Sequence, residues 1–205
     1  MLKDFASTII KKHLHHTPTG SQEKAIGMLA DFITSAERDT VFVMKGYAGT
    51  GKTSLISAVI HALDEFKLQS VLMAPTGRAA KVLSKYSGKE AFTIHKKIYR
   101  QKSSVSEQFV LDVNLLGNTF FIVDEASMIS DSQMEFNVFG SGCLLGDLLQ
   151  YVYNGKSCTL ILIGDMAQLP PIGLSVSPAL DSQYIQQHFL RSTTEITLTD
   201  VVRQA

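Results

Sequence analysis

The chain has 205 residues, 45% apolar and 19% charged, so it can bury a substantial core as one domain or two small ones. No apolar run approaches the roughly 18 residues that span a bilayer, and residues 1–16 lack the long apolar core of a secretory signal. Cys143 and Cys158 are the only cysteines, which indicates neither a disulfide framework nor a zinc site, and Cys158 lies in an apolar run typical of a buried thiol. We expect a soluble, cytoplasmic, monomeric protein.

The charge is unevenly distributed although the formal net charge is zero. Residues 77–106 contain eight Lys or Arg against Glu90 alone, a net charge of +7, so the rest of the chain carries −7. A local basic stripe of this kind can bind the phosphates of a nucleic acid. A solvated helix face would give the same composition, so both interpretations stay open at this point.

Short apolar strands are expected to alternate with amphipathic helices. A helical extension is expected over 1–16, and helices follow over 22–33 and around 55–63, where apolar residues recur at helical spacing. The expected strands are 40–44, 70–74, 119–123, 159–163 and 195–198. This alternation predicts a three-layer α/β/α fold with a mainly parallel sheet. Residues 101–118 are polar and irregular enough to be a surface insertion. Residues 140–142, Gly-Ser-Gly, are expected to break a helix.

Residues 46–53 read Gly-Tyr-Ala-Gly-Thr-Gly-Lys-Thr, the full P-loop pattern, between an expected strand and an expected helix. Glycines let the backbone curl so that N–H groups point at phosphate oxygens, and the helix N-terminus adds partial positive charge. The lysine can reach the β- and γ-phosphates, and the following hydroxyl can ligate Mg²⁺. The alternative is a glycine-rich turn without a ligand. The pattern predicts an ATP site at Gly46, Ala48, Gly49, Thr50, Gly51, Lys52 and Thr53.

An apolar strand ends in two adjacent acids, Asp124 and Glu125. The carboxyl ends of parallel strands line one crevice, so these acids are expected near the phosphate site. Asp124 is suited to hold Mg²⁺, usually through water, and Glu125 to orient and deprotonate an attacking water. Acids after a strand are also common helix caps. Together with the P-loop, the pair favours hydrolysis over transfer to a bound acceptor.

Another apolar strand runs into the segment Gly-Asp-Met-Ala-Gln-Leu-Pro-Pro at 164–171. If this strand neighbours the strand of Asp124, Gln168 lies beside the γ-phosphate. An uncharged amide there can hydrogen-bond both the phosphate and the attacking water. The alternative is a Gly-Asp turn closed by prolines.

Six ordered segments carry a family resemblance: 46–53, Ala-Pro-Thr-Gly-Arg-Ala-Ala-Lys at 74–81, Thr-Ile-His-Lys at 93–96, Asp-Glu-Ala-Ser at 124–127, 164–171, and Leu-Thr-Asp-Val-Val-Arg-Gln at 198–204. In this order they resemble superfamily 1 helicases, most of all the RecD/Dda-like branch. The resemblance implies a RecA-like domain over residues 17–205 and ATP-driven translocation on single-stranded DNA, in that branch 5′ to 3′.

The resemblance also implies roles for single residues. Lys52 and Thr53 would contact phosphate and Mg²⁺, and Asp124 would hold Mg²⁺. Glu125 would act as the catalytic base, and Gln168 would sense the γ-phosphate. Arg203 is similar to an arginine that approaches the γ-phosphate, where a permanently charged guanidinium suits the transition state. Gln22 resembles the glutamine that reads adenine. The run Thr-Gly-Ser-Gln at 19–22 equally fits a helix capping box.

The DNA-contacting segments of the family match 75–81 and 93–96, within or beside the basic stripe. The candidate contacts are Pro75, Thr76, Arg78, Lys81, His95 and Lys96. Arg78, Lys81 and Lys85 would share a helix face and could contact phosphates without reading sequence. His95 fits a structural histidine equally well. The group His13, His15 and His16 is interpreted as a solvated helix end rather than a metal site.

The helicases that the chain resembles continue into a second RecA-like domain, for which the sequence offers no candidate segments. We therefore expect an incomplete motor that binds ATP weakly, hydrolyses it slowly and does not unwind DNA alone. Two other classes stay open: a stand-alone P-loop kinase, and a catalytically inert nucleotide- or DNA-binding module. A GTPase is disfavoured because no Asn-Lys-x-Asp segment occurs.

Overall fold

The computed structural model describes residues 1–103, 107–131, 138–168 and 177–202. Within these ranges, six parallel strands form one sheet in the order β3-β2-β6-β7-β1-β8. The strands of this sheet are β1 (Thr40–Gly46), β2 (Gln69–Ala74), β3 (Ala91–Thr93), β6 (Thr119–Val123), β7 (Thr159–Asp165) and β8 (Ser192–Leu198). A separate antiparallel pair is formed by β4 (Tyr99–Gln101) and β5 (Phe109–Leu111).

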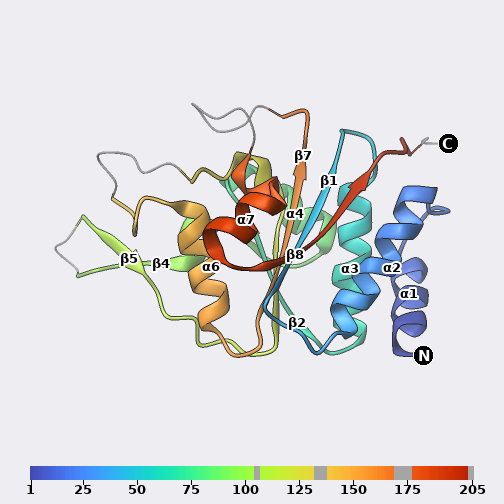
Figure 1. Ribbon diagram of the computed structural model, residues 1–205, viewed down its shortest axis with the longest axis horizontal. Helices are drawn as coiled ribbons and strands as arrows, with labels where there is room; N and C mark the ends of the chain where they lie inside the picture. Colours follow the sequence, from blue (N-terminus) through green and yellow to red (C-terminus); the bar gives the residue numbers. More distant parts are fainter. Residues whose placement is uncertain (104–106, 132–137, 169–176, 203–205) are drawn as a thin grey trace.

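Helices connect the parallel strands, as crossover connections require. The described helices are α1 (Leu2–Lys12) and α2 (Gly20–Thr34), which precede β1, and α3 (Lys52–Glu65), α4 (Gly77–Ser87), α5 (Ile94–Ile98), α6 (Leu144–Asn154) and α7 (Ser182–Phe189), with short 3-10 turns η1 (Ala126–Met128) and η2 (Pro178–Leu180). In Figure 1, α1, α2 and α3 lie on one side of the sheet, and α6 and α7 on the other. No described helix has the length and apolar content of a membrane span.

Alternate side chains of the strands pack into two separate cores. On β1, Phe42 and Met44 join the core under α1, α2 and α3, whereas Val41 and Val43 join the core under α5, α6 and α7. The period of two along each strand places neighbouring residues on opposite faces. Every residue of β6 and β7 is buried, as expected of central parallel strands. The predicted three-layer α/β/α architecture is confirmed.

One expectation about local structure needs correction. Residues 101–118 are not simply a surface insertion: they include β5, and the buried Asn114 donates a hydrogen bond from Nδ2 to the carbonyl of Val152 at 3.2 Å. Three-residue strands give too short a pattern to be recognised. The segment 140–142 is a turn before α6, with positive φ at Gly140 and Gly142.

His13, His15 and His16 lie at and after the end of α1, as predicted, but two of them are only partly exposed. Helix α1 ends at Lys12, and Ala6, Ile9 and Ile10 on its inner face belong to the same core as α2 and α3. The ring of His13 lies 3.0 Å from a carboxylate oxygen of Glu65. The ring of His16 is hydrogen-bonded within the N-terminal region of α2, leaving only His15 exposed.

Candidate functional site

The strand order brings three sequence segments to one edge of the sheet. β7 lies between β1 and β6, so the loop after β1, the acids after β6 and the turn after β7 are neighbours at the carboxyl ends of the strands. All three line a single pocket with a volume of about 1150 Å³. Crevices at this edge of α/β sheets are the usual place for ligands. The condition set for Gln168, a strand next to that of Asp124, is met.

The loop 46–51 between β1 and α3 has the backbone that its glycines permit. Gly49 and Gly51 have φ of +82° and +80°, in the left-handed region that favours glycine. A Cβ on Gly51 would also come within 2.3 Å of Nε2 of Gln22. Gly51 is the N-cap of α3, and no side chain caps this helix end. The first N–H groups of α3 therefore face the pocket as an anion site.

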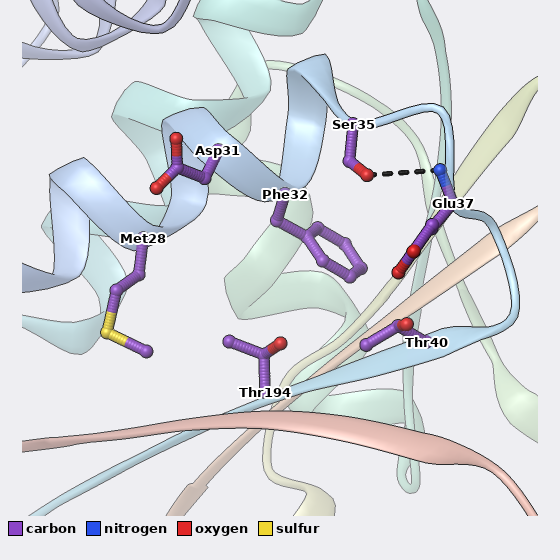
Figure 2. A pocket seen from close by; sticks show the side chains of 7 residues that line it. All are labelled: Met28, Asp31, Phe32, Ser35, Glu37, Thr40 and Thr194. Atoms are coloured by element: carbon purple, nitrogen blue, oxygen red, sulfur yellow. Dashed lines mark hydrogen bonds between the residues drawn. The ribbon is translucent and has the colours of Figure 1, made fainter.

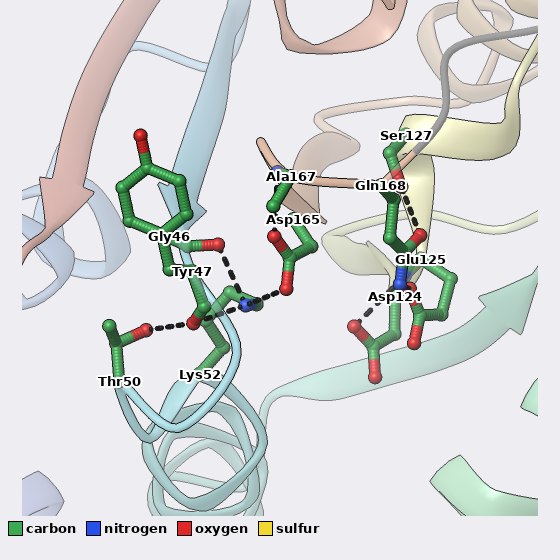
Figure 3. Close-up of polar contacts among 10 residues, drawn as sticks. All are labelled: Gly46, Tyr47, Thr50, Lys52, Asp124, Glu125, Ser127, Asp165, Ala167 and Gln168. Carbon is green, nitrogen blue, oxygen red and sulfur yellow. Dashed lines mark hydrogen bonds and ion pairs between the residues drawn. The ribbon is translucent and has the colours of Figure 1, made fainter. Parts of the chain in front are cut away.

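Lys52 is held inside the loop. Its Nζ donates to the carbonyls of Gly46 (2.8 Å) and Tyr47 (2.9 Å) and forms an ion pair with Asp165 at 3.2 Å (Figure 3). Asp165 is buried, and it also accepts a hydrogen bond from the backbone N–H of Ala167. The role of Asp165 was not foreseen. Its position at the last residue of β7, in register with Gly46 of β1, is what places it beside the lysine.

Asp124 and Glu125 lie at the same pocket, directly after β6. Burial raises the pKa of Asp124 to about 6, and the neighbouring Glu125 carboxylate adds to this, although the backbone N–H of Glu125 and the charge of Lys52 oppose it. A cation bound next to Asp124 would favour the ionised form of this carboxyl and so oppose the effect of burial. Thr53 and Asp124 supply oxygen donors of the kind that Mg²⁺ prefers, so the residues fit this ion.

Gln168 links Glu125 to η1. The Gln168 Nε2 donates to a Glu125 carboxylate oxygen at 2.7 Å, and its Oε1 accepts from Ser127 Oγ at 2.7 Å (Figure 3). Glu125 has φ of +57°, a left-handed conformation that is strained for a residue with a side chain. Because Ser127 Oγ donates to Oε1 of Gln168, it fixes the amide orientation in which Nε2 of Gln168 donates to Glu125. No role for Ser127 was predicted.

Three other predicted nucleotide contacts lie behind the pocket wall. The pocket is lined by Ala48, Gly49, Gly51, Lys52 and Thr53, but not by Gly46, Thr50 or Gln22. Thr50 turns its hydroxyl back to the carbonyl of Tyr47 at 2.8 Å. The capping box is present: Oε1 of the buried Gln22 accepts from the N–H of Thr19, whose Oγ1 accepts from the N–H of Gln22.

The segment after β8 is tied to the P-loop. Val202 donates its backbone N–H to the carbonyl of Gly49 at 2.9 Å. Asp200 accepts from the backbone N–H of Ser21 at 2.7 Å, and this hydrogen bond lowers its pKa. Both contacts bring residues 200–202 against the loop and the start of α2. Arg203, the predicted arginine, lies outside the described residues, as do 169–171 of the Gln168 segment.

The predicted DNA contacts gather where β2 and β3 end. Thr76 and Thr93 cap α4 and α5, accepting from the backbone N–H groups of Ala79 and Lys96. Pro75 is partly buried in the turn after β2, and Lys96 lies over the ring of Phe92.

The basic residues divide into paired and unpaired ones. Lys89 is paired with Asp64, and Arg100 with Asp112. Arg78, Lys81 and Lys85 are exposed on α4 and form no ion pair within the described ranges. His95 packs against the rings of Tyr99 and Phe139, and burial lowers its pKa, which favours the neutral form at pH 7. The exposed face of α4 is thus the stronger phosphate-binding candidate.

A smaller pocket of about 270 Å³ lies at the opposite edge of the sheet, where β1 begins (Figure 2). Two of its polar side chains have partners: Asp31 is paired with Lys3, and Ser35 accepts from the N–H of Glu37 at 3.0 Å. It holds no group from the P-loop or the acidic pair, so the large pocket is the candidate site.

Comparisons with known proteins agree with this geometry. A family model described as an AAA domain matches residues 19–205. The chain is 30% identical over 191 residues, 90% of its length, to the ATP-dependent DNA helicase dda of Enterobacteria phage T4, and 30% identical over 163 residues, 80% of its length, to the ATP-dependent RecD2 DNA helicase of Deinococcus radiodurans. The matches cover 39% and 19% of those two proteins.

The fold is also found in a solved structure. The crystal structure of Pif1 helicase from Candida albicans superposes with a TM-score of 0.56 at 20% identity, covering 92% of this chain and 41% of that one. This likeness concerns the fold, a RecA-like domain with a mainly parallel sheet. The chain belongs to the AAA domain family, and over most of its length it is similar to one segment of two ATP-dependent DNA helicases.

Proposed function

We propose that this chain binds ATP with Mg²⁺ and hydrolyses it as the first motor domain of a DNA helicase that moves 5′ to 3′ on single-stranded DNA, together with a second RecA-like domain. The observation that carries the proposal is the convergence of Lys52, the Asp124–Glu125 pair and Gln168 on one pocket. The proposal rests on the relatives for DNA, on the family resemblance of the sequence motifs for direction and the second domain, and on the pocket for the nucleotide.

Each pocket residue has a chemical task in this proposal. Lys52 would exchange its two carbonyl partners for phosphate oxygens, and the uncapped N-terminus of α3 would add N–H donors. Mg²⁺, held by Thr53 and Asp124, would supply charge neutralisation for the phosphates. Glu125 would take a proton from the attacking water, and Gln168 would leave Glu125 to hydrogen-bond the γ-phosphate.

ATP hydrolysis measured with and without single-stranded DNA tests the proposal. In a protein that contains this chain and its second motor domain, we expect DNA to stimulate turnover. Glu125→Gln should abolish turnover while preserving ATP binding. DNA-independent transfer of phosphate to a small acceptor would point to a kinase instead, and no turnover at all would point to an inert binding module.

For DNA contact, we propose that Arg78 and Lys81 on α4 bind backbone phosphates. Neutralising both should weaken binding to all sequences and flatten the dependence of log affinity on log salt by about 1.4, because each phosphate contact on a single strand contributes about 0.7. A matched control neutralises Lys3 and Lys24 on the exposed faces of α1 and α2. An equal effect of the two double variants would remove α4 from the interface.

A further inference from the structure

The outermost strand β8 has an unprotected side. It stands at the end of the strand order, crosses in front of the other strands in Figure 1, and pairs with β1 along all seven of its residues. Among the residues that the structure describes, no strand pairs with its other side. Its sequence, Ser-Thr-Thr-Glu-Ile-Thr-Leu, lacks the Lys and Pro residues that commonly guard such an edge, and its pairing with β1 has no bulge. The outward backbone groups of β8 are therefore available to a further strand.

The two faces of the sheet beside β8 differ. On the face covered by α7, Thr193 Oγ1 accepts a hydrogen bond from Gln186 Nε2 at 2.6 Å. On the same face, Glu195 is paired with Lys45 at 2.5 Å. On the face covered by α2, Thr194 lines the pocket of about 270 Å³. A side chain of an added strand that stands opposite Thr194 would share this face and reach the pocket.

The pocket under α2 combines apolar side chains with an unpaired carboxylate. Met28 and Phe32 of α2 face β8, and Glu37 lies at one end of the pocket (Figure 2). Glu37 is exposed and forms no ion pair within the described ranges. The neighbouring Arg38 is turned away, because its guanidinium lies over the ring of Phe120 at 5.2 Å from the ring centre. A long aliphatic side chain that ends in a cation fits this combination, since its stem can cover the apolar groups.

We propose that β8 binds an extended segment of a partner protein, which adds a strand to the sheet and places a Lys or Arg side chain in the pocket under α2. Backbone hydrogen bonds to β8 hold the segment, and the basic side chain pairs with Glu37. A second copy of this chain fits the edge less well, because antiparallel pairing about the middle of β8 sets Glu195 opposite its own copy. The partner is therefore a different chain with a basic residue in a strand-forming segment.

Fluorescence anisotropy of labelled peptides measures this binding to the whole chain. The probe has seven residues, the length of β8, with one Lys among Thr and Val residues. A second peptide carries Met in place of the Lys, which removes the charge. We expect the wild type to bind the Lys peptide roughly 2- to 5-fold more tightly than the Met peptide, the effect of one exposed ion pair. Glu37→Gln should remove this difference, whereas Glu107→Gln, an exposed carboxylate between β4 and β5, is the matched control.

Methylation of the peptide backbone tests the addition of a strand. In an extended peptide, alternate N–H groups point to opposite sides, so two versions of the Lys peptide are methylated on one or the other set. The version methylated on the side that faces β8 should bind roughly 10-fold or more weakly, because several hydrogen bonds are lost. The version methylated on the outer side should bind within about 2-fold of the unmodified peptide. Amide hydrogen exchange should show that the unmodified Lys peptide protects β8.

Each remaining outcome counts against the proposal. If the Lys peptide does not bind, or if both methylated versions bind equally, no strand is added to β8. If the wild type binds the Lys and Met peptides equally, or if Glu37→Gln keeps the preference for Lys, the partner is not selected by a basic side chain. A dimer of the wild type in sedimentation that the Lys peptide does not dissociate would assign the edge to a second copy. These results are independent of the proposed function, because neither Glu37 nor β8 lines the large pocket.

Discussion

Replacing Asp124 with Asn should stabilise the chain in the absence of nucleotide and metal. Burial raises the pKa of Asp124 to about 6, compared with an ordinary value of about 3.9. The folded chain therefore holds a proton that the unfolded chain has already lost between these two pH values. Stability from this group is fully present below about pH 4 and is lost as pH rises to about 6.

The magnitude follows from the difference of about two pKa units. At about 1.36 kcal/mol per unit, ionised Asp124 lowers the free energy of unfolding by about 3 kcal/mol at pH 8, and by about 1 kcal/mol at pH 4.5. The Asn side chain keeps the oxygen that accepts from the N–H of Glu125 at 2.9 Å, but carries no charge. Asp124→Asn should therefore gain up to these amounts relative to the wild type.

Urea denaturation followed by circular dichroism at pH 4.5 and pH 8, with chelator present, measures this gain. Asp39→Asn is the control, because the Asp39 side chain is 86% exposed. Added Mg²⁺ should stabilise the wild type at pH 8 and leave Asp124→Asn unchanged. Equal gains at both pH values, or no gain at pH 8, would refute the reasoning.

Three further predictions follow, two on contacts in the site and one on a buried hydrogen bond outside it. Lys52→Ala should abolish ATP binding in calorimetry, and it should lower the free energy of unfolding by about 3 kcal/mol because it leaves Asp165 buried and unpaired. Adding Asp165→Asn should restore stability but not binding. Unchanged ATP affinity in the single variant would contradict the assignment of Lys52. Ser127→Ala should slow steady-state ATP hydrolysis of a two-domain protein without weakening ATP binding, because Gln168 loses the hydroxyl that orients its amide; unaltered turnover would show that the orientation does not matter. Tyr99→Phe should lower the free energy of unfolding in urea by about 1–3 kcal/mol, because the buried carboxylate of Asp147 loses the Tyr99 hydroxyl that donates to it at 2.6 Å. A stability equal to that of the wild type would count against this account.

The local parts of the site could be predicted from the sequence. The P-loop is one continuous segment whose glycines and lysine act at fixed spacing, and the structure gives Gly49 and Gly51 the positive φ that the pattern requires. Asp124 was placed correctly because parallel strands end at one edge of a sheet. Five of the six parallel strands were expected, and only the three-residue β3 was too short to be recognised.

The non-local contacts could not be predicted in this way. The pairing of Lys52 with Asp165 depends on β7 lying next to β1, and no single segment of the sequence determines the order of the strands. Gln22 illustrates the limit: the same four residues fitted an adenine contact and a capping box, and the structure contains the box with the side chain buried. Ser57 and Tyr86, which are 29 positions apart, are joined by a hydrogen bond because α4 packs against α3.

The hydrogen bond between Val202 and the carbonyl of Gly49 has a mechanical consequence. Because Gly49 lies in the loop that we propose to bind phosphate, a change in this loop on exchange of nucleotide must either break that bond or pull Val202 with it. We expect residues 200–202 to move together with the loop, by an amount that differs between the triphosphate and diphosphate states.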